Sequence, residues 1–129
     1  GGGMKFRNVL AIIAVLSNST SAQQTGPSSV KLKDALLAPN GFDVESACGR
    51  GGASINRSHL VFRDEEGKVI IEINNFDRGT CKKEARLGDD SFTFDGCRDS
   101  GISMKYDPAS KESPFKGQSR QCNYVFRVK

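Results

Sequence analysis

The chain carries four cysteines behind a segment with the features of a secretory signal peptide, and this combination limits what it can fold into. Residues 4–22, MKFRNVLAIIAVLSNSTSA, contain a basic start, an apolar run from Val9 to Leu16 and small residues up to Ala22. We therefore expect the protein to be secreted, with a mature N-terminus near Gln23. In an oxidising compartment, four cysteines are expected to form disulfides rather than a metal site or redox-active thiols.

The sequence divides into four segments. Gly1–Gly3 precede the initiator methionine and are interpreted as a cloning remnant, and residues 4–22 as the signal peptide. Residues 23–29, QQTGPSS, are polar and lack an apolar anchor, so they are predicted to form a flexible leader. Residues 30–129 then form one disulfide-linked domain. No apolar run approaches the about 20 residues that a membrane-spanning helix needs, so we expect no membrane span.

The charge balance does not favour nucleic acid as a partner. Because Lys5 and Arg7 leave with the signal peptide, the formal net charge falls from +4 to +2. Nucleic-acid-binding domains usually carry a strongly basic face that neutralises phosphates. The local basic cluster of Lys82, Lys83 and Arg86 is diluted by acidic neighbours, so it is interpreted as a solvated loop.

Alternation of apolar and polar residues from Phe42 onward predicts a mainly β domain. Five runs rich in β-branched and aromatic residues predict strands, and a weaker run predicts a sixth. The five are residues 60–63, 68–73, 91–94, 102–106 and 123–128, and the sixth is residues 53–56. Residues 30–37 fit either one short helix or an edge strand, which Pro39 to Gly41 would end. We expect a single antiparallel β-sandwich or small barrel of five to six strands, with at most one short helix near the N-terminus.

The two central runs predict a hairpin around a four-residue turn, Asp64–Gly67. This turn places Arg63 opposite Lys68, and His59 then lies opposite Glu72. One face of the hairpin is apolar and is predicted to enter the core. Its residues are Leu60, Phe62, Val69, Ile71 and Ile73.

The cysteines are predicted to form two disulfides. Cys48, Cys81, Cys97 and Cys122 are widely spaced, and His59 is the single histidine, so neither a metal site nor a cofactor is expected. Three pairings satisfy the sequence. We favour Cys48 with Cys122, which would link the two ends of the domain. Cys81 would then pair with Cys97 and hold the loop that leads into the following strand.

One candidate catalytic group is present. His59 and Glu72, with Arg63 nearby, are the kinds of residue that secreted microbial ribonucleases use as acid, base and phosphate ligand. The chain offers no second histidine. A histidine and a glutamate opposite each other on a solvated face are more common as a surface contact. An enzyme is therefore the less favoured interpretation.

Two further surface features emerge from the sequence. Asn56-Arg57-Ser58 is an acceptor sequence for N-linked glycosylation, and a glycan on Asn56 would crowd any substrate cleft around His59. Residues 107–121 are polar and interrupted by proline and glycine, which predicts a mobile surface loop that could carry binding residues.

The layout of the whole chain resembles the small secreted cysteine-containing proteins of filamentous fungi, including effectors of plant pathogens. The resemblance lies in the signal sequence of residues 4–22, the polar QQTGPSS leader, and one short β-rich domain with four cysteines. It implies a monomeric virulence protein that binds a host macromolecule, in the first place a protein, without enzymatic activity. Such a protein acts outside the host cell or is translocated into it. No functional residue is carried over from the resemblance.

Two functions are therefore considered. The favoured one is a non-enzymatic effector-like protein that binds its host partner through an exposed sheet edge or through residues 107–121. The alternative is a small secreted hydrolase, ribonuclease-like, that uses His59, Glu72 and Arg63.

Overall fold

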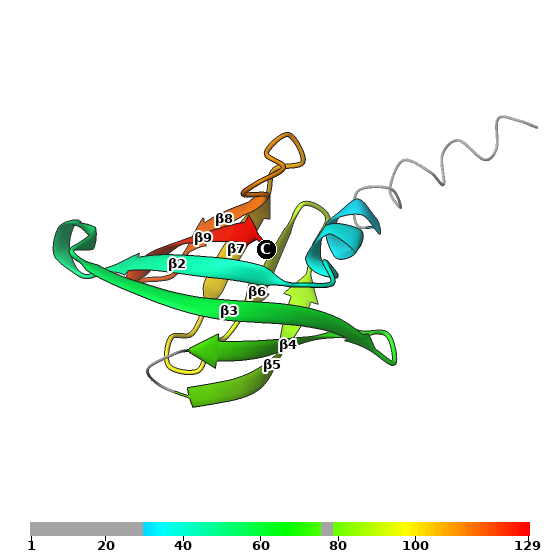
Figure 1. The fold of residues 1–129 in the computed structure, drawn as a ribbon, viewed down its shortest axis with the longest axis horizontal. Helices are drawn as coiled ribbons and strands as arrows, with labels where there is room; N and C mark the ends of the chain where they lie inside the picture. The colour runs from blue at the N-terminus through cyan, green and yellow to red at the C-terminus, as the bar shows by residue number, and fades with distance from the viewer. Residues whose placement is uncertain (1–29, 76–78) are drawn as a thin grey trace, which may run out of the picture.

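The computed structural model describes residues 30–75 and 79–129, which form a closed antiparallel β-barrel (Figure 1). Each strand pairs with the next along the chain, and the last pairs with the first. The signal peptide and leader predicted before residue 30 lie outside the described residues, as do Gly1–Gly3. In the described part the strands are β2 (Phe42–Cys48), β3 (Ser54–Glu65), β4 (Lys68–Asn75), β5 (Gly79–Leu87), β6 (Ser91–Phe94), β7 (Ile102–Tyr106), β8 (Phe115–Gln118) and β9 (Cys122–Val128).

The prediction of a mainly β antiparallel domain is confirmed. Of the two expected architectures the structure has the barrel and not the sandwich, and the expected number of five to six strands is wrong. The described residues form eight strands, and the sheet closes on itself. The run at residues 53–56 and the run at residues 60–63 belong to one long strand, β3. Because each strand of a closed barrel has a neighbour on both sides, the barrel has no complete edge strand, although β5 pairs with β6 at only Arg86 and Leu87.

Strand β5 replaces the predicted solvated loop around Lys82, Lys83 and Arg86. Its less exposed positions, Cys81, Lys83, Ala85 and Leu87, alternate with exposed polar residues, but Ala85 is the one buried residue, so the apolar pattern is weak. The strand pairs with β4 from Gly79 to Ala85, and with β6 at Arg86 and Leu87. Backbone pairing with β4 therefore defines the strand more than its weak hydrophobic pattern does.

Strand β8 lies within residues 107–121, so the prediction of one continuous mobile loop is wrong. Phe115 is fully buried, and the strand pairs with β7 and with β9. A Cβ atom at Gly117 would collide with the backbone of Ser103 and with Met104. Glycine is needed here because β7 and β8 approach each other closely.

A short helix over residues 30–36 covers one end of the barrel, so the helical alternative of the sequence prediction is correct. Leu32 and Leu36 are fully buried in the core. The Lys33 ammonium lies 2.9 Å from an Asp64 carboxylate oxygen, and this hydrogen bond lowers the pKa of Asp64. Among the described residues, no helix is long and apolar enough to cross a membrane.

Aromatic side chains fill the middle of the barrel. Six phenylalanines are buried there, and adjacent ring centroids such as those of Phe92 and Phe115 lie 5.4 Å apart in an edge-to-face arrangement. Eight-stranded barrels are narrow enough for inward side chains to fill them, and edge-to-face contacts suit aromatic rings. The barrel is therefore solid at its centre and at its helix end.

The β3–β4 hairpin has a two-residue turn, Glu66–Gly67, rather than the predicted four-residue turn. Both residues have positive φ angles, 54° and 84°, as a type I′ turn requires. Glu65 therefore lies opposite Lys68, and the register differs by two residues from the prediction. A shift of two keeps every side chain on its face. All five predicted core residues of the hairpin are accordingly buried: Leu60, Phe62, Val69, Ile71 and Ile73.

Two disulfides cross-link the barrel, one between two strands and one between a strand and a connecting segment. Cys48 and Cys122 lie directly opposite each other on β2 and β9 and are bonded. Cys81 on β5 is bonded to Cys97, in the segment after β6. This is the pairing that the sequence analysis favoured. The second disulfide joins β5 to the segment after β6. It adds a covalent link between two strands that pair only at Arg86–Thr93 and Leu87–Phe92.

Candidate functional site

The end of the barrel opposite the helix contains a cavity of about 290 Å³. This open end is formed by the ends of strands β2, β3, β4 and β9, at Cys48, Asn56, Asn75 and Cys122. Inward-facing residues of six strands line the cavity, together with the β6–β7 loop, residues 95–101, and the β8–β9 turn, residues 119–121.

The lining changes from apolar to polar toward the open end. The floor consists of nearly fully buried apolar side chains, namely Val44, Leu60, Ile73, Phe94 and Ile102. Further out, the inward positions of β2, β3 and β4 carry neutral polar side chains, namely Ser46, Ser58, Asn56 and Asn75. On β3 the change comes one inward position earlier than on β2, because apolar Val44 pairs with Ser58, and Ser46 pairs with Asn56.

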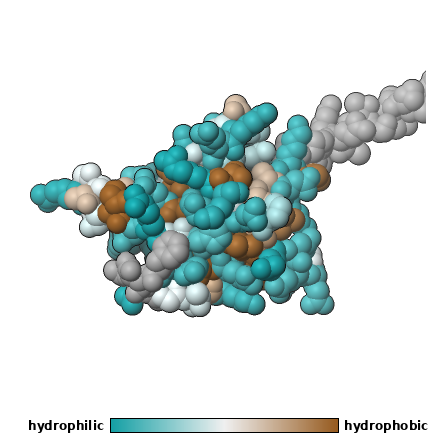
Figure 2. All heavy atoms as spheres, viewed as in Figure 1, coloured by the Kyte–Doolittle hydropathy of each residue, from teal (hydrophilic) through white to brown (hydrophobic). Residues whose placement is uncertain are grey.

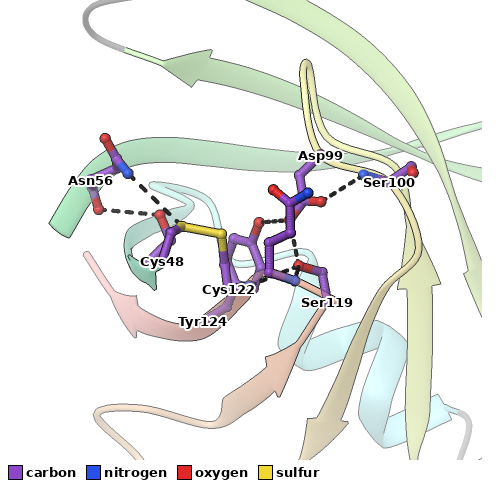
Figure 3. The surroundings of a disulfide bond; sticks show 9 residues. Cys48, Asn56, Asp99, Ser100, Ser119, Cys122 and Tyr124 are labelled. Carbon is purple, nitrogen blue, oxygen red and sulfur yellow. Dashed lines mark hydrogen bonds between the residues drawn. A yellow bond between two sulfur atoms is a disulfide. The ribbon is translucent and has the colours of Figure 1, made fainter. Parts of the chain in front are cut away.

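A hydrogen-bond network around Asp99 holds the β6–β7 loop against β9 and the β8–β9 turn (Figure 3). The hydroxyl groups of Tyr124 and Ser119 both donate to Oδ2 of Asp99, the latter at 2.5 Å. The backbone N–H of Ser100 donates to Oδ1 at 3.0 Å. The Ser119 oxygen in turn accepts the backbone N–H of Cys122 at 3.1 Å. Both oxygens of the Asp99 carboxylate therefore accept hydrogen bonds from other groups of the protein.

Tyr124 remains protonated in this network. Burial of its side chain raises the pKa of the hydroxyl far above the usual value of 10, and the hydrogen bond to Asp99 raises it further. A neutral hydroxyl is a donor that keeps the Asp99 carboxylate satisfied. Tyr124, which lines the cavity, therefore keeps its hydrogen bond to Asp99 at physiological pH.

The β2–β3 hairpin extends past the neighbouring strands at the open end and carries the short 3-10 helix η3 (Arg50–Gly52) at its turn (Figure 1). Ile55 lies near this hairpin tip, opposite Ala47, and its side chain is 53% exposed. In Figure 2, hydrophobic atoms reach the surface near this end of the molecule, while most of the surface in view is hydrophilic. We use the term hairpin tip for Ala47, η3 and Ile55.

The predicted pairing of His59 with Glu72 is wrong, because the two-residue turn places His59 opposite Asn74. His59 Nδ1 lies 3.2 Å from an oxygen of Asp43 on β2. Glu72 instead lies 3.1 Å from Arg63 Nε and 3.8 Å from Lys82 Nζ. His59 and Glu72 border the same open hollow on the outer surface of β3, β4 and β5, but each is paired with a different group.

Asn56, the predicted glycosylation site, is exposed on β3 at the edge of the cavity. Its amide nitrogen lies 3.9 Å from the sulfur of Cys48 (Figure 3). A glycan on this asparagine would stand at the open end. In the described part of the chain, no group of three or more His, Cys, Asp or Glu is arranged to hold a metal ion.

The cavity was not predicted from the sequence. The feature that could have indicated it is a polar residue at an inward position of a strand, as with Ser58 two residues before Leu60. Such a pattern becomes informative only when several strands are known to lie side by side.

Comparison with protein-family models, with curated proteins and with solved structures finds no match to this chain. Function is therefore inferred from the geometry and chemistry of the site.

Proposed function

We propose that this protein is a secreted, effector-like binding protein that recognises a host protein through its hairpin tip. The observation that supports this most directly is Ile55, a large apolar residue that is 53% exposed beside the projecting turn of the hairpin. Such a side chain would gain from burial in the apolar centre of a protein interface. Residues 42–48 and 54–65, the two strands of the hairpin, pair along the full length of β2.

The ribonuclease-like alternative has less support. General acid–base catalysis needs both groups within reach of one substrate. Glu72 is already bound to two cations, Arg63 and Lys82, and His59 is paired with Asp43. Such polar contacts between neighbouring side chains are expected on the solvated outer face of a barrel.

A capture experiment tests the proposal. The secreted protein is immobilised and exposed to extract from candidate hosts, beside an Ile55→Ser variant and a Val128→Ser control. Val128 is also apolar and 46% exposed, but it lies at the other end of β9. A specific host protein should be retained by the wild type and the control. Retention by Ile55→Ser should fall at least about tenfold, as expected for an interface anchor. Equal retention by all three proteins would contradict a role for the hairpin tip.

The alternative is tested with His59→Ala combined with Glu72→Gln. Because both residues make contacts on the outer face of the barrel, the free energy of unfolding should change by less than about 1 kcal/mol, and host binding should be unchanged. RNA cleavage is measured in parallel. If the wild type cleaves RNA and the folded double variant is at least about 100-fold slower, the hydrolase becomes the better assignment.

A further inference from the structure

The barrel contains a second candidate site, distinct from the hairpin tip. We infer that the cavity at the open end binds a small, uncharged amphipathic molecule of one or two rings, with its apolar part inward and hydroxyl or amide groups outward. This inference goes beyond the binding of a host protein, because it concerns inward-facing side chains, whereas Ile55 faces outward.

The layered lining determines the orientation of the ligand. Leu60, Ile73 and Phe94 form part of a floor that offers contacts only to apolar atoms. Ser58, Asn56 and Asn75 surround the upper level with hydroxyl and amide groups, which both donate and accept hydrogen bonds. Pockets for small molecules typically combine an apolar surface with a few polar groups that fix orientation, and they occur in the mouths of β-barrels.

The size of the cavity limits the ligand. Its volume of about 290 Å³ lies at the lower end of the roughly 300–1,000 Å³ range that is typical for small-molecule pockets. It corresponds to about ten water molecules at their volume in the liquid. One or two fused rings fit this space, whereas a long lipid chain does not.

The charges at the open end favour a neutral ligand. Arg98 and Asp99 are adjacent in the β6–β7 loop and both line the cavity, so their charges oppose each other. The Asp99 carboxylate accepts hydrogen bonds from Tyr124 and Ser119 and thus has its own partners. The remaining polar side chains of the lining are neutral. An ionised ligand would lose hydration here without gaining one dominant counter-charge.

The inference is tested by titrating the purified secreted protein with 2-naphthol, which has two fused apolar rings and one hydroxyl group. Isothermal titration calorimetry should show a 1:1 complex with a Kd below about 1 mM. Naphthalene-2-sulfonate, with the same rings and an anionic group, should bind at least about tenfold more weakly. Absence of saturable 2-naphthol binding by the folded protein would overturn the site, and equal binding of both probes would overturn its preference for neutral ligands.

Two variants locate the complex in the cavity. Asn56→Trp places a large side chain at the exposed edge of the cavity, and Ser58→Phe fills it from β3. Each should weaken 2-naphthol binding at least about tenfold. The matched control is Arg57→Trp, since Arg57 lies between them, faces outward and contacts Glu45 at 3.6 Å. Asn56→Trp changes an exposed residue, so it remains a test if Ser58→Phe does not fold.

Unchanged affinity in folded Asn56→Trp, or an equal loss in Arg57→Trp, would show that 2-naphthol binds elsewhere and would overturn the inference. The titration contains no host material. Its failure would therefore leave the capture experiment on the hairpin tip unaffected, and loss of capture by Ile55→Ser would leave the cavity site unaffected.

Discussion

At the scale of single residues, the aromatic centre of the barrel should carry much of the stability. The Phe62 ring lies 5.8 Å from that of Phe42 and 5.7 Å from that of Phe92, in edge-to-face contacts. We expect Phe62→Ala to lower the free energy of unfolding by about 3–5 kcal/mol, because it removes these contacts and leaves a cavity. Urea unfolding provides the measurement. The adjacent, exposed Arg63→Ala should cost far less, and equal losses would contradict the assignment of the two faces.

Tyr124 should make stability depend on pH in the alkaline range. Its pKa in the folded protein is raised above the usual value of 10 by burial and by Asp99. Above pH 10 the unfolded chain loses this proton while the folded chain keeps it, so the free energy of unfolding falls as pH rises. Tyr124→Phe should cost about 1–2 kcal/mol at pH 7. This difference should shrink above about pH 10. Urea unfolding across this range checks it, and a constant difference would contradict the raised pKa.

At the scale of elements, the β3–β4 turn has an unfavourable residue at one position. Glu66 has a φ angle of 54°, in the left-handed region that Asn and Gly tolerate better than Glu. Glu66→Asn produces the Asn-Gly pair that type I′ turns prefer. We expect it to raise the free energy of unfolding by about 0.5–1 kcal/mol. Thermal and urea unfolding measure the change, and a loss of stability would contradict the two-residue turn.

At the scale of the whole molecule, the disulfides close loops of very different length. Cys48 and Cys122 are 74 residues apart in sequence, whereas Cys81 and Cys97 are 16 apart. Replacing the first pair by serine should lower the free energy of unfolding by about 4 kcal/mol, and replacing the second pair by about 3 kcal/mol. The native protein should contain no thiol that reacts with an alkylating reagent, which intact mass reveals. A smaller loss for the first pair would contradict an effect set by loop entropy.

The sequence by itself determined features that depend on local pattern. Alternation placed Phe62 and Ile71 on the buried face of their hairpin, and this assignment survives a register error of two residues because side-chain direction repeats every two residues. The even number of four cysteines predicted two disulfides but left three pairings open; the pairing favoured among them is the one observed, which links β2 to β9 and β5 to the segment after β6.

Only the tertiary structure decided the features that depend on distant partners. Strand β5 has a weak apolar pattern and is stabilised by pairing with β4, and β8 contains a glycine that a strand pattern disfavours. The partner of His59 is Asp43 and not Glu72, since the β3–β4 turn sets the register with β4, and β2 pairs with the other edge of β3. The cavity could not be predicted from the sequence for the same reason. Ser58 and Asn75 belong to one polar layer only because separate strands bring them to the same level of a closed sheet, and no local pattern encodes that non-local pairing.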